Sequence, residues 1–167
     1  NLWTGDNYRL LDAFVKHLKP NLVIEIGTSF GTSALALKKY LPEKSVLYTY
    51  DILPVENTKM PLLNQEDFTD GKLKQIIGNL ANYEFFLTQK DILENADLIF
   101  IDAVKDIFTE EKFIKNFEKI TFKKPVIMIW DDIKVIPQIW RTIDRPKLDI
   151  TSFGHFAGTG LVYWENR

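Results

Sequence analysis

Acidic side chains recur where the apolar segments of this 167-residue chain end. Asp51, Asp91 and Asp102 each follow one such segment, and the adjacent pair Asp131 and Asp132 follows another. Carboxylates accept hydrogen bonds from ribose hydroxyls and bind divalent cations. Ligands of open α/β sheets bind beyond the carboxyl ends of the strands. We therefore expect these acids to surround one ligand site.

Two glycines follow the first apolar segment, 22–26. Gly27 ends this segment, Gly31 lies four residues later, and a helical pattern begins at Thr32. Glycines let the backbone approach a ligand closely, and the start of a helix offers free N–H donors. Glu25 interrupts the apolar segment, and a buried carboxylate is costly unless a donor satisfies it. We therefore expect Glu25 to face a ligand or the amides of the loop.

Asp51 ends the next apolar segment, where an acid can accept hydrogen bonds from both hydroxyls of a ribose. The glycine spacing, G-x-x-x-G, departs from the G-x-G-x-x-G of dinucleotide sites, which disfavours a nicotinamide or flavin cofactor. An aspartate after a strand also often caps a helix or turns the chain, so each acid alone has a structural alternative. Together, Asp51 and the glycine turn predict a nucleoside-like ligand.

Hydrophobic periodicity predicts alternating strands and helices. The predicted strands are 22–26, 45–50, 83–88, 97–101, 126–130, 148–153 and 161–164. The predicted helices are 6–18 (capped by Asp6), 32–41, 72–80, a turn at 92–96, 109–120 (capped by Thr109) and 137–143, with a long irregular loop at 52–70. The last two strands are joined by a short turn, so we expect a mostly parallel α/β sheet with one antiparallel strand. The length predicts a single domain over residues 1–167.

The composition is that of a soluble globular protein. Hydrophobic residues make up 46% of the chain, charged residues 26%, and the net charge is −2. This charge gives no general attraction to nucleic acid or to an anionic membrane, and no apolar run approaches a membrane span. The absence of cysteine excludes disulfides and thiolate sites. We expect a cytoplasmic protein without nucleic-acid or membrane partners. A homodimer is one arrangement that we consider. The sequence starts at Asn1 rather than Met, which is compatible with trimming of the N-terminus.

The segment V-I-E-I-G-T-S-F-G-T-S (23–33), with Asp51 after the next strand, resembles the first two motifs of class I S-adenosylmethionine-dependent methyltransferases. The resemblance implies a Rossmann-like, mostly parallel seven-stranded sheet with helices on both faces and an antiparallel strand from a C-terminal hairpin. The commoner family pattern has glycine where Ser29 stands, although the O-methyltransferase branch often lacks it. The resemblance further implies that the methionine portion of S-adenosylmethionine lies against the loop from Glu25 to Gly31, its ribose at Asp51 and its adenine near Gln89 or Asp91. The cofactor-binding residues that it implies are Glu25, Gly27, Thr28, Ser29, Gly31, Asp51, Ile52, Gln89, Asp91 and Asp102.

Two further segments are similar to those of cation-dependent catechol-type O-methyltransferases. They are L-I-F-I-D-A-V-K-D-I-F (98–108) and I-W-D-D-I (129–133). Carried over, Asp102, Asp131 and Asp132 become Mg2+ ligands, and Lys105 becomes the base. Asp132 stands where this branch has Asn, and Phe108 where it has Tyr. Those enzymes usually carry further helices ahead of the first strand, whereas one is predicted here, so we expect a shortened or missing lid over the cofactor.

Charge balance favours a smaller ligand set. Three aspartates around a dication leave an excess negative charge, which would make Lys105 a poorer base. Two aspartates leave the balance near zero. Adjacent residues on an extended strand point to opposite faces. We therefore prefer Asp102 and Asp131 as ligands and leave Asp132 open.

Several alternatives stay open from the sequence. Lys105 can also be a surface lysine paired with Asp106 or Asp102, and His155 is a rival base or a solvated loop histidine. The leading function is methyl transfer from S-adenosylmethionine to a hydroxyl of a small-molecule acceptor, with Mg2+ assistance. The alternatives are a metal-independent O- or N-methyltransferase and a non-catalytic cofactor-binding domain. The acceptor would contact the 52–70 loop, the N-terminal segment and the 154–160 turn, which are the least predictable parts.

Overall fold

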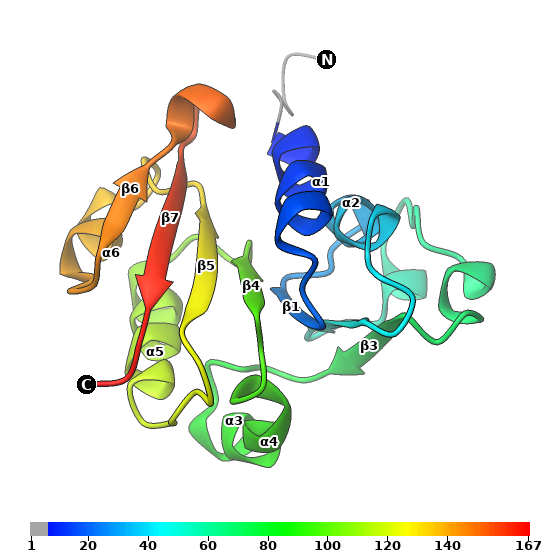
Figure 1. Cartoon of the computed structure of the whole chain (residues 1–167), viewed down its shortest axis with the longest axis horizontal. Coiled ribbons are helices and arrows are strands. Elements are labelled where there is room, and N and C mark those ends of the chain that lie inside the picture. Colours follow the sequence, from blue (N-terminus) through cyan, green and yellow to red (C-terminus); the bar gives the residue numbers. More distant parts are fainter. Residues whose placement is uncertain (1–6) are drawn as a thin grey trace.

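The computed structural model describes residues 7–167, and within this range seven strands form one sheet in the order β3-β2-β1-β4-β5-β7-β6. Neighbouring strands are parallel except at β7, which is antiparallel to both β5 and β6. The edge strands β3 and β6 lie at opposite sides of Figure 1. The strands are β1 (Leu22–Ile26), β2 (Val46–Asp51), β3 (Leu73–Ile77), β4 (Leu98–Ile101), β5 (Val126–Asp131), β6 (Lys147–Asp149) and β7 (Thr159–Trp164). The predicted fold class is confirmed.

Helices cover both faces of the sheet. They are α1 (Asn7–Leu18), α2 (Thr32–Lys39), α3 (Tyr83–Thr88), α4 (Lys90–Leu93), α5 (Ile107–Phe117) and α6 (Pro137–Thr142). Side chains of α1 and α2 pack with Val23 and Leu98 on one face, whereas those of α3 to α6 pack with Ile24 and Ile99 on the other. This division follows from the strand period, since successive side chains point to opposite faces.

Two predicted elements have the wrong type. Residues 72–80, predicted as a helix, contain the edge strand β3 (Leu73–Ile77), whose Leu73 pairs with Leu47 of β2. Residues 83–88, predicted as a strand, form α3, because the Asn82 side chain caps this helix by accepting a hydrogen bond from the amide of Phe85 at 3.1 Å. The cap and the burial of Phe86 outweigh the β propensity of the aromatic residues.

The boundaries of other elements also differ from the prediction, as α5 and β6 show. The predicted helix 109–120 is α5, and its N-cap is Asp106, whose carboxylate accepts from the Thr109 amide at 2.8 Å, rather than Thr109 itself. The predicted strand 148–153 is β6 followed by a short 3-10 helix, Thr151–Phe153. The predicted cap Asp6 lies outside the described residues.

The 52–70 loop contains two short 3-10 helices, Val55–Asn57 and Gln65–Phe68. Leu63 of this loop is buried against α2, which ties the loop to the α1 and α2 side of the sheet. In the part of the chain described, no helix combines the length and the apolar character that crossing a membrane requires.

Candidate active site

A cavity of about 460 Å³ opens at the carboxyl ends of β1 to β4. Its volume falls in the usual range of small-molecule sites, roughly 300–1,000 Å³. We call it the glycine-loop cavity. Its lining residues are Ile26, Gly27, Ser29, Tyr50, Asp51, Ile52, Gly78, Asn79, Leu80, Asp102, Ala103, Val104, Thr109 and Phe113.

Gly27 fixes the floor of this cavity. Its amide donates to the Tyr50 carbonyl at 2.8 Å, and its φ of 105° lies in the left-handed region. A Cβ at this position would lie 2.0 Å from the Asp102 carbonyl oxygen. Only glycine therefore lets the end of β1 lie against the end of β4 without displacing it.

Asp51 closes the cavity on the β2 side. Its Oδ2 accepts from the amide of Ser29 at 2.9 Å, and its Oδ1 accepts from the amide of Leu53 at 3.1 Å. These bonds fix the carboxylate orientation and hold the glycine loop. Each carboxylate oxygen can still accept another hydrogen bond, which fits the two hydroxyls of a ribose.

Glu25 lies behind the cavity and is fully buried. Its Oε2 accepts from the hydroxyl of Thr49 at 2.5 Å, and Thr49 is its partner in register on β2. Burial raises the pKa of Glu25 to about 8, against the opposing effect of the nearby Ser33 and Thr49 hydroxyls. Thr49 of the neighbouring strand is thus the donor to Oε2, while the buried Oε1 has no hydrogen-bond partner within residues 7–167, so the expected contact of Glu25 with a ligand or the loop amides stays a prediction.

Five of the predicted cofactor residues are absent from the lining of the glycine-loop cavity within residues 7–167: Glu25, Thr28, Gly31, Gln89 and Asp91. Thr28 is buried, with its hydroxyl 2.6 Å from that of Thr49. A Cβ on Gly31 would meet the Leu63 side chain, 2.3 Å from its Cγ. These residues shape the loop from behind.

The residues predicted near the adenine, Gln89 and Asp91, lie outside the lining of the glycine-loop cavity. Gln89 accepts a hydrogen bond from the Tyr50 hydroxyl at 3.3 Å, one layer behind the cavity, and Asp91 lies in the first turn of α4. The residues that follow β3 line the cavity instead, namely Gly78, Asn79 and Leu80. Gly78, unusual within the predicted helix, was the available signal that a strand ends there.

A second cavity of about 390 Å³ adjoins the first. We call it the aspartate cavity. Asp102 lines both cavities, so they meet at the end of β4. The lining residues are Asn7, Tyr8, Asp102, Asp131, Asp132, Val135, His155, Phe156 and Ala157.

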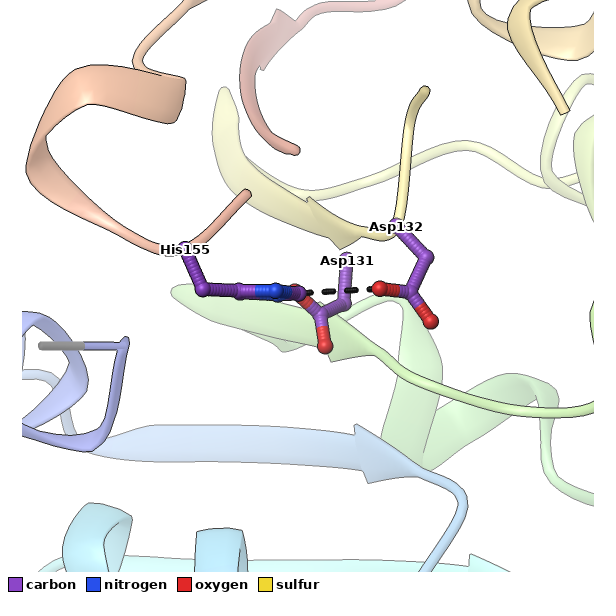
Figure 2. A group of neighbouring side chains, drawn as sticks. All are labelled: Asp131, Asp132 and His155. Carbon is purple, nitrogen blue, oxygen red and sulfur yellow. Dashed lines mark hydrogen bonds and ion pairs between the residues drawn. The ribbon is translucent and has the colours of Figure 1, made fainter. Parts of the chain in front are cut away.

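Asp131, Asp132 and His155 converge in the aspartate cavity (Figure 2). The Nε2 of His155 lies 2.6 Å from Oδ1 of Asp131 and 3.6 Å from Oδ1 of Asp132. One possible ligand atom from each residue lies within 4.8 Å of the others. The hydrogen bond to Asp131 raises the pKa of His155. This trio fits a divalent cation.

The backbone of Asp132 explains why two adjacent aspartates reach one cavity. Its φ of 57° lies in the left-handed region, which aspartate tolerates better than most residues. Asp132 therefore leaves the alternation of β5, and the expectation that it points away from Asp131 does not hold. The sequence offered no signal for this turn.

Lys105 lies in a network of acids, largely buried, rather than on the surface. Its Nζ lies 3.2 Å from Oδ1 of Asp102 and 3.9 Å from Oε1 of Glu110, and it donates to the Asp131 carbonyl at 3.3 Å. Asp106, the alternative partner, caps α5 instead. Lys105 thus joins the ends of β4 and β5.

The cluster carries an excess of negative charge. Asp102, Asp131, Asp132 and Glu110 offer four carboxylates against one lysine. Burial raises the pKa of Glu110 to about 7, and burial with neighbouring charges also raises the pKa of Asp102 and of Asp132. A bound cation would relieve this repulsion.

Comparisons with known proteins identify the family to which the chain is similar. The model of a family described as O-methyltransferase matches residues 4–137. The catechol O-methyltransferase of Mus musculus is 25% identical over 131 residues, which cover 76% of this chain and 48% of the relative. The chain therefore spans about half the length of this curated relative.

Solved structures share the fold. A methyltransferase from Geobacter sulfurreducens aligns with a TM-score of 0.68 at 17% identity, covering 95% of this chain and 78% of the other. The SAH-bound methyltransferase PaMTH1 from Podospora anserina aligns with a TM-score of 0.64 at 19% identity, with the same coverages of 95% and 78%.

Proposed function

The chain belongs to the O-methyltransferase family, and from this we propose that it transfers a methyl group from S-adenosylmethionine to a hydroxyl of a small-molecule acceptor. The resemblance to S-adenosylmethionine-dependent methyltransferases noted in the sequence is thereby confirmed at the level of the family.

One observation carries the proposal: Asp102 lines both cavities. Methyl transfer from a sulfonium is an in-line displacement, so it requires donor and acceptor to be held on either side of one point. We place the donor in the glycine-loop cavity, with its ribose on Asp51 and its methionine portion along Gly27 to Ser29. Its adenine then lies at Asn79 and Leu80. The Podospora anserina protein, which shares the fold, contains bound SAH (S-adenosylhomocysteine, the product form of the cofactor), and this supports the choice of ligand.

We place the acceptor in the aspartate cavity. Val135 and Phe156 line it and are 55% and 70% exposed, which suits an acceptor with an apolar portion. The murine relative is a catechol O-methyltransferase, so catechols are the first acceptors to assay.

The acceptor hydroxyl must lose its proton, and we assign this step to Lys105, with His155 as the rival base. A divalent cation would supply Lewis acidity, which lowers the pKa of a hydroxyl beside it. Asp131 and Asp132 would hold the cation, and Asp102 would lie at the boundary with the donor. Magnesium, implied by the sequence resemblance, stays a prediction.

Incubation with methyl-labelled S-adenosylmethionine and a panel of catechols and simple phenols tests the proposal. We expect label to enter an acceptor, which mass spectrometry identifies as the methyl ether. Loss of turnover in EDTA and its return with a divalent cation would support cation assistance, whereas full turnover in EDTA would favour a metal-independent enzyme. Absence of transfer to every acceptor together with no binding of the cofactor product would refute the proposal.

A further inference from the structure

The aspartate cavity contains a nitrogen donor that the sequence did not assign to a metal. His155 reaches Asp131 and Asp132 from the segment between β6 and β7, and its ring points toward both carboxylates (Figure 2). We propose that Asp131, Asp132 and His155 bind a first-row transition-metal dication in preference to magnesium. This inference rests on the proposed function, since it specifies the cation beside the acceptor.

The donor spacing already suits one ion. Two ligands about 2.1 Å from a metal and at right angles lie about 3.0 Å apart. The distances from His155 Nε2 to the two carboxylate oxygens, 2.6 and 3.6 Å, bracket this value. Small side-chain adjustments would therefore bring all three donors onto one ion.

Asn7 supplies an independent indication of a ligand in this cavity. The residue is 4% exposed and lines the cavity, and its Nδ2 donates to Oδ1 of Asp131 at 3.3 Å. Its buried carbonyl oxygen has no hydrogen-bond partner within residues 7–167. An unsatisfied buried acceptor is costly, and a water on a bound ion would satisfy it.

The chemistry of the donors selects the class of metal. Magnesium prefers oxygen ligands alone, whereas imidazole suits zinc, iron, nickel and copper. Asp102, the remaining aspartate that lines this cavity, is paired with Lys105 at 3.2 Å. The described donor set is therefore two carboxylates and one imidazole.

Cobalt(II) and magnesium titrations of the whole protein, without cofactor or acceptor, test the inference. Cobalt binding is read from its visible absorption, and magnesium binding from competition against cobalt. Transition metals generally bind any such site more tightly than magnesium, so the informative quantity is the effect of His155→Gln on each ion. We expect H155Q to weaken cobalt binding by at least about tenfold and to change magnesium binding far less.

His17 provides the matched control, because the chain has two histidines and His17 lies exposed in the last turn of α1. H17Q should bind cobalt as the wild type does. Equal losses for both ions in H155Q, or unchanged cobalt binding, would overturn the inference.

A measurement on the wild type avoids any effect of the variant on folding. Zinc(II) should shift the imidazole nitrogen resonances of His155 and leave those of His17 in place. If no ion shifts His155 while S-adenosylhomocysteine still binds, this inference fails and the proposed function stands. If the cofactor product also fails to bind, the proposed function fails as well.

Discussion

At the scale of single residues, the acids of this site differ in what they do. Asp51 lines the glycine-loop cavity, whereas Glu25 is buried and accepts a hydrogen bond from Thr49 of the neighbouring strand. Both were expected at the cofactor from the sequence, because type and position look alike for a buried carboxylate and an exposed one. The distinction comes from the register of β1 against β2, which sets Glu25 beside Thr49.

Glu25 should make the stability of the fold depend on pH. Its pKa is about 8 in the folded protein and about 4.5, the ordinary value of a glutamate, in the unfolded chain, so only the folded state keeps the proton between these values. Its stabilising contribution is present below about pH 4.5 and is lost as pH rises through about 8. Relative to Glu25→Gln, the wild type should lose up to about 1.4 kcal/mol of unfolding free energy per pH unit in this window.

Urea unfolding of both proteins between about pH 5 and 8 measures this difference. Glu111→Gln, at an exposed position on α5, is the control and should follow the wild type. A constant difference between E25Q and wild type across the range would show that Glu25 is ionised in the fold.

Lys105 is the residue on which the proposed proton transfer depends. Lys105→Met should lower kcat by about two to four orders of magnitude, because general-base catalysis typically contributes that much. The affinity for S-adenosylhomocysteine should change little, since Lys105 is not among the residues lining the glycine-loop cavity. Steady-state kinetics with a catechol that the wild type methylates measure kcat. Calorimetric titration with S-adenosylhomocysteine measures the affinity.

Lys115→Met is the matched control, because Lys115 forms an exposed pair with Glu111 on the surface of α5. It should keep both kcat and affinity. If the Lys105→Met variant kept the kcat of the wild type, Lys105 would not be the general base.

At the scale of elements, the strands that carry strong apolar runs could be predicted from the sequence. β1, β2, β4 and β5 are near the predicted residues, and their terminal Gly27, Asp51, Asp102 and Asp131 lie at the two cavities. These strands are buried on both faces, so they consist of nearly continuous apolar runs that can be recognised in the sequence.

The elements at the edge could not be predicted with the same success. β3 is an edge strand with one buried residue, Leu73, so it lacks a clear apolar run, and α3 depends on the cap made by Asn82. Because these two types are exchanged in the prediction, Asn79 and Leu80, which line the glycine-loop cavity, are not among the predicted cofactor residues. The approach of His155 to Asp131 is a contact between distant segments, which local patterns do not encode.

The turn after β1 yields a test of how closely its elements must pack. Gly27→Ala would place a Cβ against the Asp102 carbonyl, whereas Gly71, at a φ of 73°, has nothing within 4 Å of such a Cβ. Gly71→Ala should cost about 1–2 kcal/mol, from the left-handed backbone alone. We expect Gly27→Ala to cost at least about 2 kcal/mol more, and to weaken cofactor binding.

Chemical unfolding of both variants measures this difference. Equal losses would mean that the Asp102 backbone can move aside, and that the cavity floor is not fixed by Gly27.

At the scale of the whole molecule, the sheet divides into two halves, each of which presents one of the two cavities. Strand order reverses between β1 and β4, and the crevice at such a point is where open α/β sheets bind ligands. The half with β1 to β3 presents the glycine loop and Asp51, and the half with β4 to β7 presents the acids and His155. Gly27 and Asp102 meet at the boundary.

The proposed roles of the two cavities depend on one claim, that the glycine-loop cavity binds S-adenosylmethionine through Asp51. Calorimetric titration with S-adenosylhomocysteine tests the claim without any acceptor. We expect one site per chain in the wild type, and a loss of about 10- to 100-fold in Asp51→Ala, because hydrogen bonds to a charged group contribute about 1.5–3 kcal/mol. Asp144→Asn, at an exposed pair with Arg167, should bind as the wild type does. Absence of binding to the wild type, or equal affinity in Asp51→Ala, would contradict the account.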